Sequence, residues 1–218
     1  MDATPKHPIN PRTVGRLSIY RRVLNQLTAD GTDRLFSRDL AKMAGVSASQ
    51  VRQDLMNVPT CGTPQNGYSV TELTKAVINC LGTTETTSVV LLGAGHLGQA
   101  LLHYFQATQT HLLMKAIFEI NLNMVGKHLQ DIPVFNFEEM EDHLRLLKVR
   151  VAILALPAEE AQNAADRLVA SDVCSILNFT PVRLQVPDSV FVENNDIQTS
   201  LERVAFYAAE KIQGKVQA

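Results

Sequence analysis

A G-x-G-x-x-G motif follows an apolar run and opens an amphipathic segment: Gly93-Ala94-Gly95-His96-Leu97-Gly98. Between a buried strand and a helix, this motif binds the pyrophosphate of a dinucleotide. The first glycine permits a tight turn, the second lets the backbone approach the phosphates, and the third allows close packing of helix and strand. The N–H groups at the helix N-terminus complete the anion site. We therefore expect these six residues to bind a dinucleotide, and a tight turn without a ligand is the alternative.

An acidic residue follows this motif at an informative distance. Glu119 ends the next expected strand, 21 residues after Gly98. A carboxylate at that place accepts hydrogen bonds from the adenosine ribose and repels a 2′-phosphate. The spacing predicts that Glu119 and the adjacent Ile120 contact the cofactor, and that the cofactor is NAD or NADH rather than its 2′-phosphorylated form. A solvated strand end is the alternative for Glu119.

A second set of polar side chains lies on one short expected helix. Ser47, Ser49, Gln50, Arg52 and Gln53 place hydroxyl, amide and guanidinium groups there. Such groups bond base edges or phosphates when the helix enters the major groove of DNA. The pattern predicts a DNA-binding helix. A three-helix packing module whose polar face meets water is the alternative.

The first third of the chain supplies the elements that would position this helix. Apolar residues at helical spacing end at the Asp30-Gly31 turn signal, and Ser37 and Ser47 are expected N-caps. Segment 58–70 is rich in Pro and Gly and reads as a hairpin or wing. The expected helices cover residues 14–27, 38–44, 48–57 and 71–81. The second and third form a helix-turn-helix, which makes this part a winged-helix domain.

Beyond a polar boundary at residues 82–87, the chain alternates between strands and helices. This order predicts right-handed crossovers and a parallel sheet, so the fold class is α/β, a Rossmann domain after the winged helix. Expected strands cover 88–92, 113–119, 151–156 and 175–178, and expected helices 97–106, 137–147 and 159–170. The expected domains are 1–82, 88–196 and 197–218.

The last expected helix, residues 197–213, carries an apolar stripe at the end of the chain. Its members share one helix face: Ile197, Leu201, Val204, Ala205, Ala208 and Ile212. Since no later element follows to cover it, this stripe is expected to associate with another surface.

Composition narrows the class of protein. The chain has 218 residues, 45% of them hydrophobic, but no apolar run of the roughly 20 residues that span a bilayer. The first residues are polar and Pro-rich, unlike a signal peptide, so we expect a cytoplasmic protein without a membrane partner. Residues 1–57 hold nine Lys/Arg against five Asp/Glu, and the remainder eleven against seventeen. Only the first part therefore has the sign needed to approach phosphate.

The three cysteines match neither a disulfide framework nor a zinc cluster, and no metal site is expected. Cys61 lies in a stretch expected to be exposed, and is the one candidate for a redox role.

The chain resembles the Rex family of redox-sensing transcriptional repressors over residues 14–208. The residues that carry the resemblance lie along the whole chain: Arg16-Leu17, Tyr20 and Arg22; residues 50–55; the glycine motif with Leu102-His103-Tyr104; residues 152–158; residues 176–184; and Asp196. The string Leu177-Asn178-Phe179-Thr180-Pro181 is the most specific, since generic dehydrogenases lack it.

The resemblance implies a homodimer that exchanges its last helix and binds an AT-rich palindromic operator. NADH would release the operator and NAD⁺ would permit binding. It also implies roles for individual residues. Arg16 would belong to the DNA-binding set, Tyr104 and Asp196 would lie near the nicotinamide or the domain interface, and Arg22 would pair with Asp196 in one state. The cofactor cleft would be lined by Ala155, Leu156, Pro157, Asn178, Phe179 and Thr180. For Asp196, a helix N-cap is the alternative.

Two features depart from the family pattern. Members usually carry a second basic residue where this chain has Gln53, and an aromatic, Arg-rich wing where this chain has residues 58–67. Because each lost phosphate contact weakens binding, we expect a changed DNA affinity or operator. Two rivals stay open: a nucleotide-binding regulatory subunit without DNA binding, and a small NAD-dependent oxidoreductase. The second needs a substrate domain and a general acid or base, which the roughly 130 residues after Ser88 do not supply.

Overall fold

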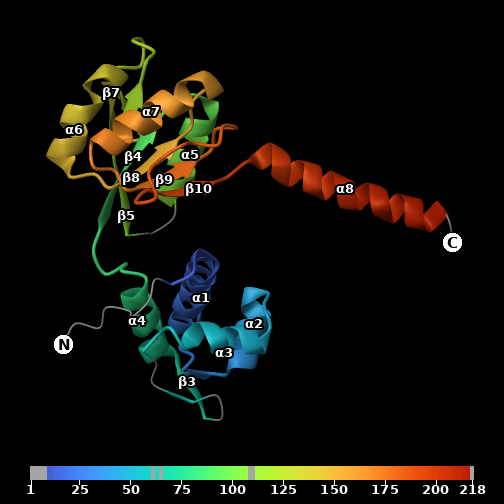
Figure 1. Cartoon of the computed structure of the whole chain (residues 1–218). Coiled ribbons are helices and arrows are strands. Elements are labelled where there is room, and N and C mark those ends of the chain that lie inside the picture. The colour runs from blue at the N-terminus through green and yellow to red at the C-terminus, as the bar shows by residue number, and fades with distance from the viewer. Residues whose placement is uncertain (1–8, 60–61, 64–65, 108–110, 217–218) are drawn as a thin grey trace. The chain divides into compact units, whose positions relative to one another are not determined.

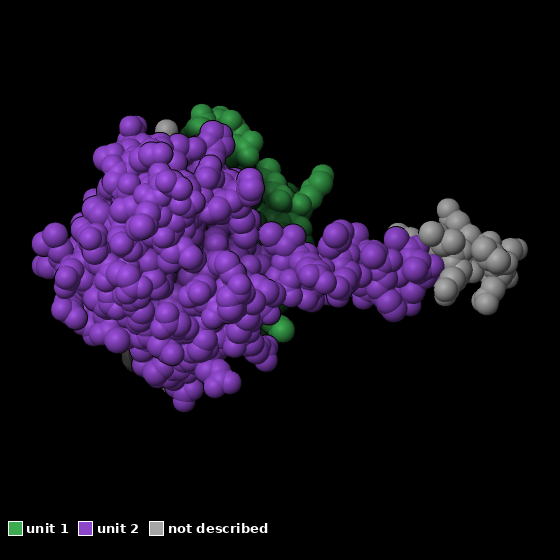
Figure 2. All heavy atoms as spheres, turned by 90° about the horizontal axis from the view of Figure 1, so that it is seen from above, with its two compact units in different colours: residues 1–85 green, residues 86–218 purple. Residues whose placement is uncertain are grey.

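The computed structural model describes residues 9–59, 62–63, 66–107 and 111–216, with the side chains of 62–63 and 211–216 left undescribed. Cys61 and much of the expected wing, residues 58–67, lie outside the described residues. The chain divides into two compact units, Met1–Glu85 and Thr86–Ala218 (Figure 2, green and purple). Each unit has its own core.

Unit 1 is a helix-turn-helix with a small antiparallel sheet, which confirms the predicted winged-helix class (Figure 1). Its core joins side chains that are 0% exposed from all four helices, among them Leu17, Leu40, Val51 and Leu73. The three strands pair in the order β1-β3-β2. The elements are α1 (Pro11–Ala29), β1 (Arg34–Leu35), α2 (Ser37–Ala44), α3 (Ala48–Leu55), β2 (Gly62–Thr63), β3 (Gly67–Ser69) and α4 (Val70–Cys80).

The turn between α2 and α3 follows from local chemistry. Gly45 ends α2 with φ +69°, a left-handed conformation that favours glycine. Ser47 caps α3, because its Oγ accepts a hydrogen bond from the N–H of Gln50 at 3.1 Å. The prediction that Ser37 caps α2 is wrong by one residue. The N-cap is Phe36, whose N–H donates to Asp39 Oδ2 at 3.3 Å, and Ser37 is buried in the first turn.

Unit 2 contains a seven-stranded sheet in the order β10-β9-β8-β4-β5-β7-β6. All neighbouring strands run parallel except β6 and β7, which confirms the predicted Rossmann class. The strands are β4 (Thr87–Leu92), β5 (Leu112–Glu119), β6 (His128–Leu129), β7 (Ile132–Asn136), β8 (Val151–Leu154), β9 (Ser175–Asn178) and β10 (Phe191–Asn194). The helices are α5 (His96–Ala107), α6 (Met140–Leu147), α7 (Ala158–Ala170) and α8 (Ile197–Val216), with a 3₁₀ turn at Phe137–Glu139.

Helices cover both faces of the sheet. Because side chains alternate along a strand, Val90 and Leu92 belong to the cluster that contains residues of α6 and α7, and Val89 and Leu91 to the cluster that contains Leu102 of α5. This two-sided burial explains why the central strands are continuous apolar runs in the sequence.

Helix α8 is exposed along the part whose side chains the structure describes, residues 197–210. Every side chain described on it is exposed, including Leu201 at 67% and Val204 at 66% (Figure 2). Neither α8 nor any other helix in the described part of the chain has the length and apolar character needed to cross a membrane.

Candidate functional site

The first group of predicted site residues meets at the carboxyl edge of the sheet in unit 2. The glycine loop follows β4, Glu119 ends β5, Ala155 follows β8, and Phe179 follows β9. These four strands are neighbours, and the chain order reverses between β4 and β8. In open parallel sheets, ligands bind in the crevice at such a reversal.

The glycine loop has the backbone geometry that the motif requires. Gly93 has φ +95°, and a Cβ there would collide with the carbonyl oxygen of Ala155. A Cβ on Gly98 would collide with the carbonyl oxygen of Gly93, so the start of α5 sits directly against the loop. Among the described residues, no heavy atom lies within 4 Å of a Cβ built on Gly95. Two glycines are therefore needed for packing, and the middle one borders open space.

Glu119 is held in place by backbone donors. Its Oε2 accepts a hydrogen bond from the N–H of Ala94 at 2.6 Å, and its Oε1 accepts from Ile120 at 2.8 Å and Asn121 at 3.0 Å. A carboxylate has about four acceptor sites, so Oε2 retains capacity toward a ribose hydroxyl. The bond to Ala94 joins the end of β5 to the glycine loop.

Asn178 and Thr180 organise the loop after β9. The Asn178 side chain donates to Val182 O at 2.8 Å and to Asn194 Oδ1 at 2.9 Å. Its Oδ1 accepts from the N–H and the hydroxyl of Thr180 at 3.0 and 2.7 Å. Both residues are buried, at 0% and 4% exposure. Their described contacts hold the loop, while Phe179, Leu156 and Ala155 are half-buried at the same edge.

Other predicted cofactor residues are exposed. His96 and Leu97 lie in the first turn of α5, where helix N–H groups are available, and Pro157 caps α7. Ile120 is 56% and Tyr104 57% exposed. The structure thus leaves these side chains accessible, and their contact with a cofactor stays a prediction.

Asp196 caps α8. Its Oδ1 accepts from the Thr199 N–H at 3.1 Å and its Oδ2 from the Thr199 hydroxyl at 2.5 Å. These bonds lower the pKa of Asp196, so the carboxylate is charged at neutral pH. Its predicted partner Arg22 is exposed on α1. Their pairing stays a prediction.

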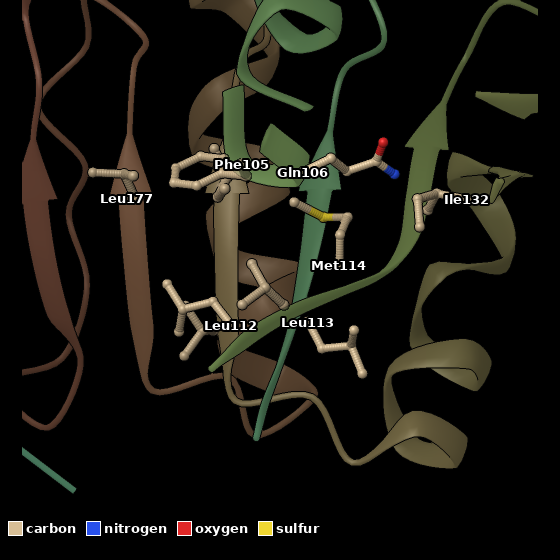
Figure 3. Close-up of a pocket in the computed structure, with 10 residues that line it drawn as sticks. Phe105, Gln106, Leu112, Leu113, Met114, Ile132 and Leu177 are labelled. Atoms are coloured by element: carbon tan, nitrogen blue, oxygen red, sulfur yellow. The ribbon is translucent and has the colours of Figure 1, made fainter. Parts of the chain in front are cut away.

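An apolar cavity of about 350 Å³ lies elsewhere on unit 2 (Figure 3). Its lining comes from strands β4, β5, β7, β8 and β9 and from Phe105 and Gln106 of α5, and it includes none of the residues predicted to contact the cofactor. It is therefore separate from the predicted cofactor crevice. Leu112 and Leu113 at this cavity are 39% and 44% exposed.

The second group of predicted residues lies on α3 in unit 1. Ser47, Ser49, Arg52 and Gln53 are exposed, and Gln50 is half-buried. The hydroxyls of Ser47 and Ser49 are 2.9 Å apart. The opposite face of α3, with Val51 and Leu55, is in the core. A polar face of this kind is what a helix in the major groove presents.

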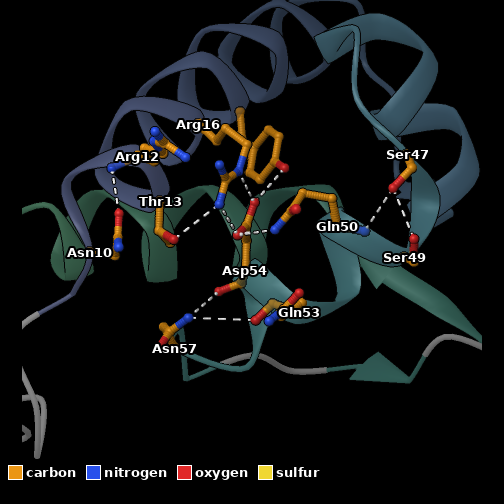
Figure 4. A network of polar contacts seen from close by, with 11 residues as sticks. Asn10, Arg12, Thr13, Arg16, Ser47, Ser49, Gln50, Gln53, Asp54 and Asn57 are labelled. Atoms are coloured by element: carbon orange, nitrogen blue, oxygen red, sulfur yellow. Dashed lines mark hydrogen bonds and ion pairs between the residues drawn. The ribbon is translucent and has the colours of Figure 1, made fainter.

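Sequence reasoning missed the buried acid at the back of this helix. Asp54 is 1% exposed and accepts hydrogen bonds from Arg16 Nε at 2.6 Å and Nη2 at 2.7 Å, from the Tyr20 hydroxyl at 2.8 Å, and from Gln50 Nε2 at 3.0 Å (Figure 4). Arg16 also donates to Thr13. The network joins α1 to α3, and it pairs the half-buried guanidinium of Arg16, a predicted DNA contact, with the buried Asp54. An acid among apolar helix positions was the available signal.

Charge in this network is stabilised by pairing. Burial raises the pKa of Asp54, but the hydrogen bonds from Arg16, Tyr20 and Gln50 outweigh burial and lower it. The bond to Asp54 raises the pKa of Arg16, and burial, with the bond to Asp54, raises that of Tyr20. Asp54 and Arg16 are therefore both charged at neutral pH.

Asp54→Asn is expected to destabilise unit 1 by about 3 kcal/mol at pH 7, since it leaves Arg16 without its carboxylate. A lowered folded-state pKa gives stabilisation that is present above the unfolded-state pKa, about 3.9, and is lost as pH falls through the folded-state value. The difference between parent and variant should therefore shrink below about pH 5. Urea unfolding followed by circular dichroism measures it, with exposed Asp30→Asn as the control. A difference that is constant from pH 7 to pH 3 would contradict the assignment.

Family models match both units. Residues 9–55 match the putative DNA-binding protein N-terminus, and residues 84–182 the CoA binding domain. The chain is 36% identical over 206 residues to the redox-sensing transcriptional repressor Rex of Thermoanaerobacter pseudethanolicus, covering 94% of this chain and 92% of that protein. It is 36% identical over 207 residues to Rex of Listeria monocytogenes, covering 95% of each.

Solved structures agree with the sequence relatives. The structure of RSP, a Rex-family repressor, is similar with a TM-score of 0.84 and 35% identity, over 98% of this chain and 100% of that one. RSP in complex with NAD⁺ and operator DNA gives a TM-score of 0.88 and 36% identity, over 97% and 98%. With this identity over nearly the full length, the chain belongs to the Rex family of redox-sensing transcriptional repressors.

Proposed function

We propose that this chain represses transcription in response to the NADH/NAD⁺ ratio. It binds operator DNA with NAD⁺ or without cofactor, and releases DNA when NADH binds. The observation that carries the proposal is the glycine loop joined to Glu119, with open space at Gly95. Structures of the related RSP with NADH, and with NAD⁺ and operator DNA, support it. The proposal assigns binding rather than a reaction, and it places the chain in the cytoplasm.

The exposed face of α3 supports the DNA-binding half of the proposal. A homodimer would present two such helices to successive turns of the major groove, which matches a palindromic operator. The cofactor would occupy the crevice lined by the loops after β4, β5, β8 and β9. The proposed domains are residues 1–82, 88–196 and 197–218.

A mobility shift with an AT-rich palindrome, with NAD⁺ and with NADH, tests the proposal. Binding that NADH weakens is the expected result. A DNA affinity that NADH does not change would contradict the proposed sensing of NADH. NADH binding without any DNA binding would favour a regulatory subunit, and turnover of a hydroxy compound with NAD⁺ would favour an oxidoreductase.

Cofactor choice is expected to depend on Glu119. The parent should bind NADH about 10- to 100-fold more tightly than NADPH, because the fixed carboxylate repels a 2′-phosphate. Glu119→Ser should narrow this gap, and Glu85→Ser, which removes an exposed acid, should not. Fluorescence titration with both cofactors measures the ratio, and equal affinities in the parent would refute the role of Glu119.

A further inference from the structure

We propose that Gln50 reads an adenine in the major groove, and that buried Asp54 is the positioning residue that fixes the Gln50 amide for this contact. This inference rests on the proposed DNA binding, and adds which base is recognised and which residue positions the side chain that recognises it.

Gln50 occupies the place on α3 from which a recognition helix reaches base edges. It lies in the first turn, three residues after the cap Ser47, and residues near the N-terminus of the recognition helix contact bases in helix-turn-helix proteins. The side chain is half-buried, so part of it remains accessible. In Figure 4 its amide nitrogen points to Asp54.

The bond to Asp54 fixes which amide atom faces outward. Gln50 Nε2 lies 3.0 Å from Asp54 Oδ1. Turning the amide over would bring Gln50 Oε1 against a carboxylate oxygen, and two acceptors repel each other. Oε1 and the second N–H of the amide are therefore left for an external partner.

Asp54 cannot readily move to accommodate a different amide orientation. Its carboxylate is bound by two nitrogens of Arg16 and by the Tyr20 hydroxyl, all within 2.8 Å. Those donors belong to α1, whose core residues Leu17 and Tyr20 are 0% exposed. Through Asp54, the packed core thus fixes the position of the Gln50 amide. Arg16 therefore affects the exposed face of α3 through its bonds to Asp54.

One acceptor beside one donor matches adenine. In the major groove, adenine presents the N7 acceptor beside the N6 amino donor, whereas guanine presents two acceptors, N7 and O6. Guanine would place O6 against Gln50 Oε1. Cytosine offers only a donor and thymine only an acceptor beside its methyl group, so each forms one bond where adenine forms two. A phosphate contact, which accepts any sequence, is the alternative outcome of the test.

Selection from a library of random DNA duplexes by the full-length protein with NAD⁺ tests the reading. The parent should enrich a sequence with adenine at one position of each half-site. In Gln50→Ala, the preference at that position alone should fall by about 5- to 150-fold, the loss of one bidentate pair. The control Gln26→Ala removes an exposed amide on α1 that is outside both the predicted DNA-binding set and the Asp54 network, and should leave that adenine preferred.

The outcomes are separable. No enriched sequence from the parent would overturn both this inference and the proposed DNA binding. An enriched sequence whose preferences Gln50→Ala leaves unchanged, with affinity lowered equally for all sequences, would show a phosphate contact and overturn only the inference. Loss of preference for a base other than adenine would also overturn it.

The positioning role has its own measurement on the intact parent protein. In a nitrogen-15 NMR spectrum without DNA, one side-chain amide proton of Gln50 should resonate downfield of the amide protons of the exposed glutamines, because it is hydrogen-bonded to a carboxylate. Gln50→Ala assigns the pair. A Gln50 amide with the shifts of a solvated glutamine would overturn the role of Asp54, whether or not adenine is read.

Discussion

A chain lacking residues 197–218 is expected to form monomers or aggregates in place of a dimer. The full-length stripe includes side chains that are more than half exposed in the single chain, Ile197 at 58%, Leu201 at 67% and Val204 at 66%. Burying a Leu, Ile or Val side chain contributes about 1.5–3 kcal/mol, so covering this stripe in both copies favours the dimer. The predicted stripe also includes Ile212, whose side chain lies outside the described residues.

Light scattering measures this outcome. Leu201→Glu should weaken the dimer as a point change, whereas Glu202→Ala, on the same turn of α8, should leave it intact. An undisturbed soluble dimer after the deletion would rule out the exchanged helix. The exposed Leu112 and Leu113 at the apolar cavity of unit 2 give an aliphatic surface of the kind such a helix would cover.

Asp196→Asn and Arg22→Ala are each expected to remove most of the effect that NADH has on DNA affinity. NADH shifts DNA binding only if it prefers one of the two states of the dimer. Reduction removes the positive charge of the nicotinamide ring, so a carboxylate near the ring loses that attraction and becomes available to a cation. We expect Asp196 to pair with Arg22 then, and the movement of α1 to misplace the recognition helices.

Because Asp196 caps α8, the substitution that removes its charge must preserve the cap. Asn caps helices as well as Asp does, so Asp196→Asn removes the charge while α8 keeps its start. A coupling of about 1–3 kcal/mol gives DNA binding that NADH weakens roughly 5- to 150-fold. Both variants should retain NADH binding within several fold but lose most of that response. Thr199→Ala weakens the cap and keeps the charge, so it should still respond. If Asp196→Asn or Arg22→Ala still releases DNA on NADH addition as the parent does, the mechanism is contradicted.

Sequence patterns predicted the elements that are long or strongly patterned. The glycine motif, the apolar central strands and the Ser47 cap each have one dominant local cause, and all three are found. Strands β1, β6, β7 and β10 were missed. Residues 128–136 turn through Gln130 and Asp131 at φ +49° and +68° without the Asn-Gly signal of a tight hairpin. Strand β10 has four residues and, among the described strands, pairs with β9 alone.

The candidate site was predictable where residue type alone fixes the role. It was not predictable where the partner is distant in sequence. Asp54 meets Arg16 across 38 positions, and only folding shows that Arg16 serves this acid. Asn178 stays a predicted lining residue, and the partners of its amide, Val182, Asn194 and Thr180, were not predicted from the sequence.

The bond between Glu119 and the Ala94 N–H means that the predicted adenosine end of the crevice is held in place before any cofactor arrives. Little ordering is then needed on binding, which favours affinity. The oxidised and reduced cofactors share the adenosine and pyrophosphate groups, so this end holds both equally. A contact that is equal in two states shifts no equilibrium, however tight it is. The predicted adenosine end of the crevice therefore determines how tightly either cofactor binds. The difference in affinity between the two redox forms must arise at the nicotinamide end.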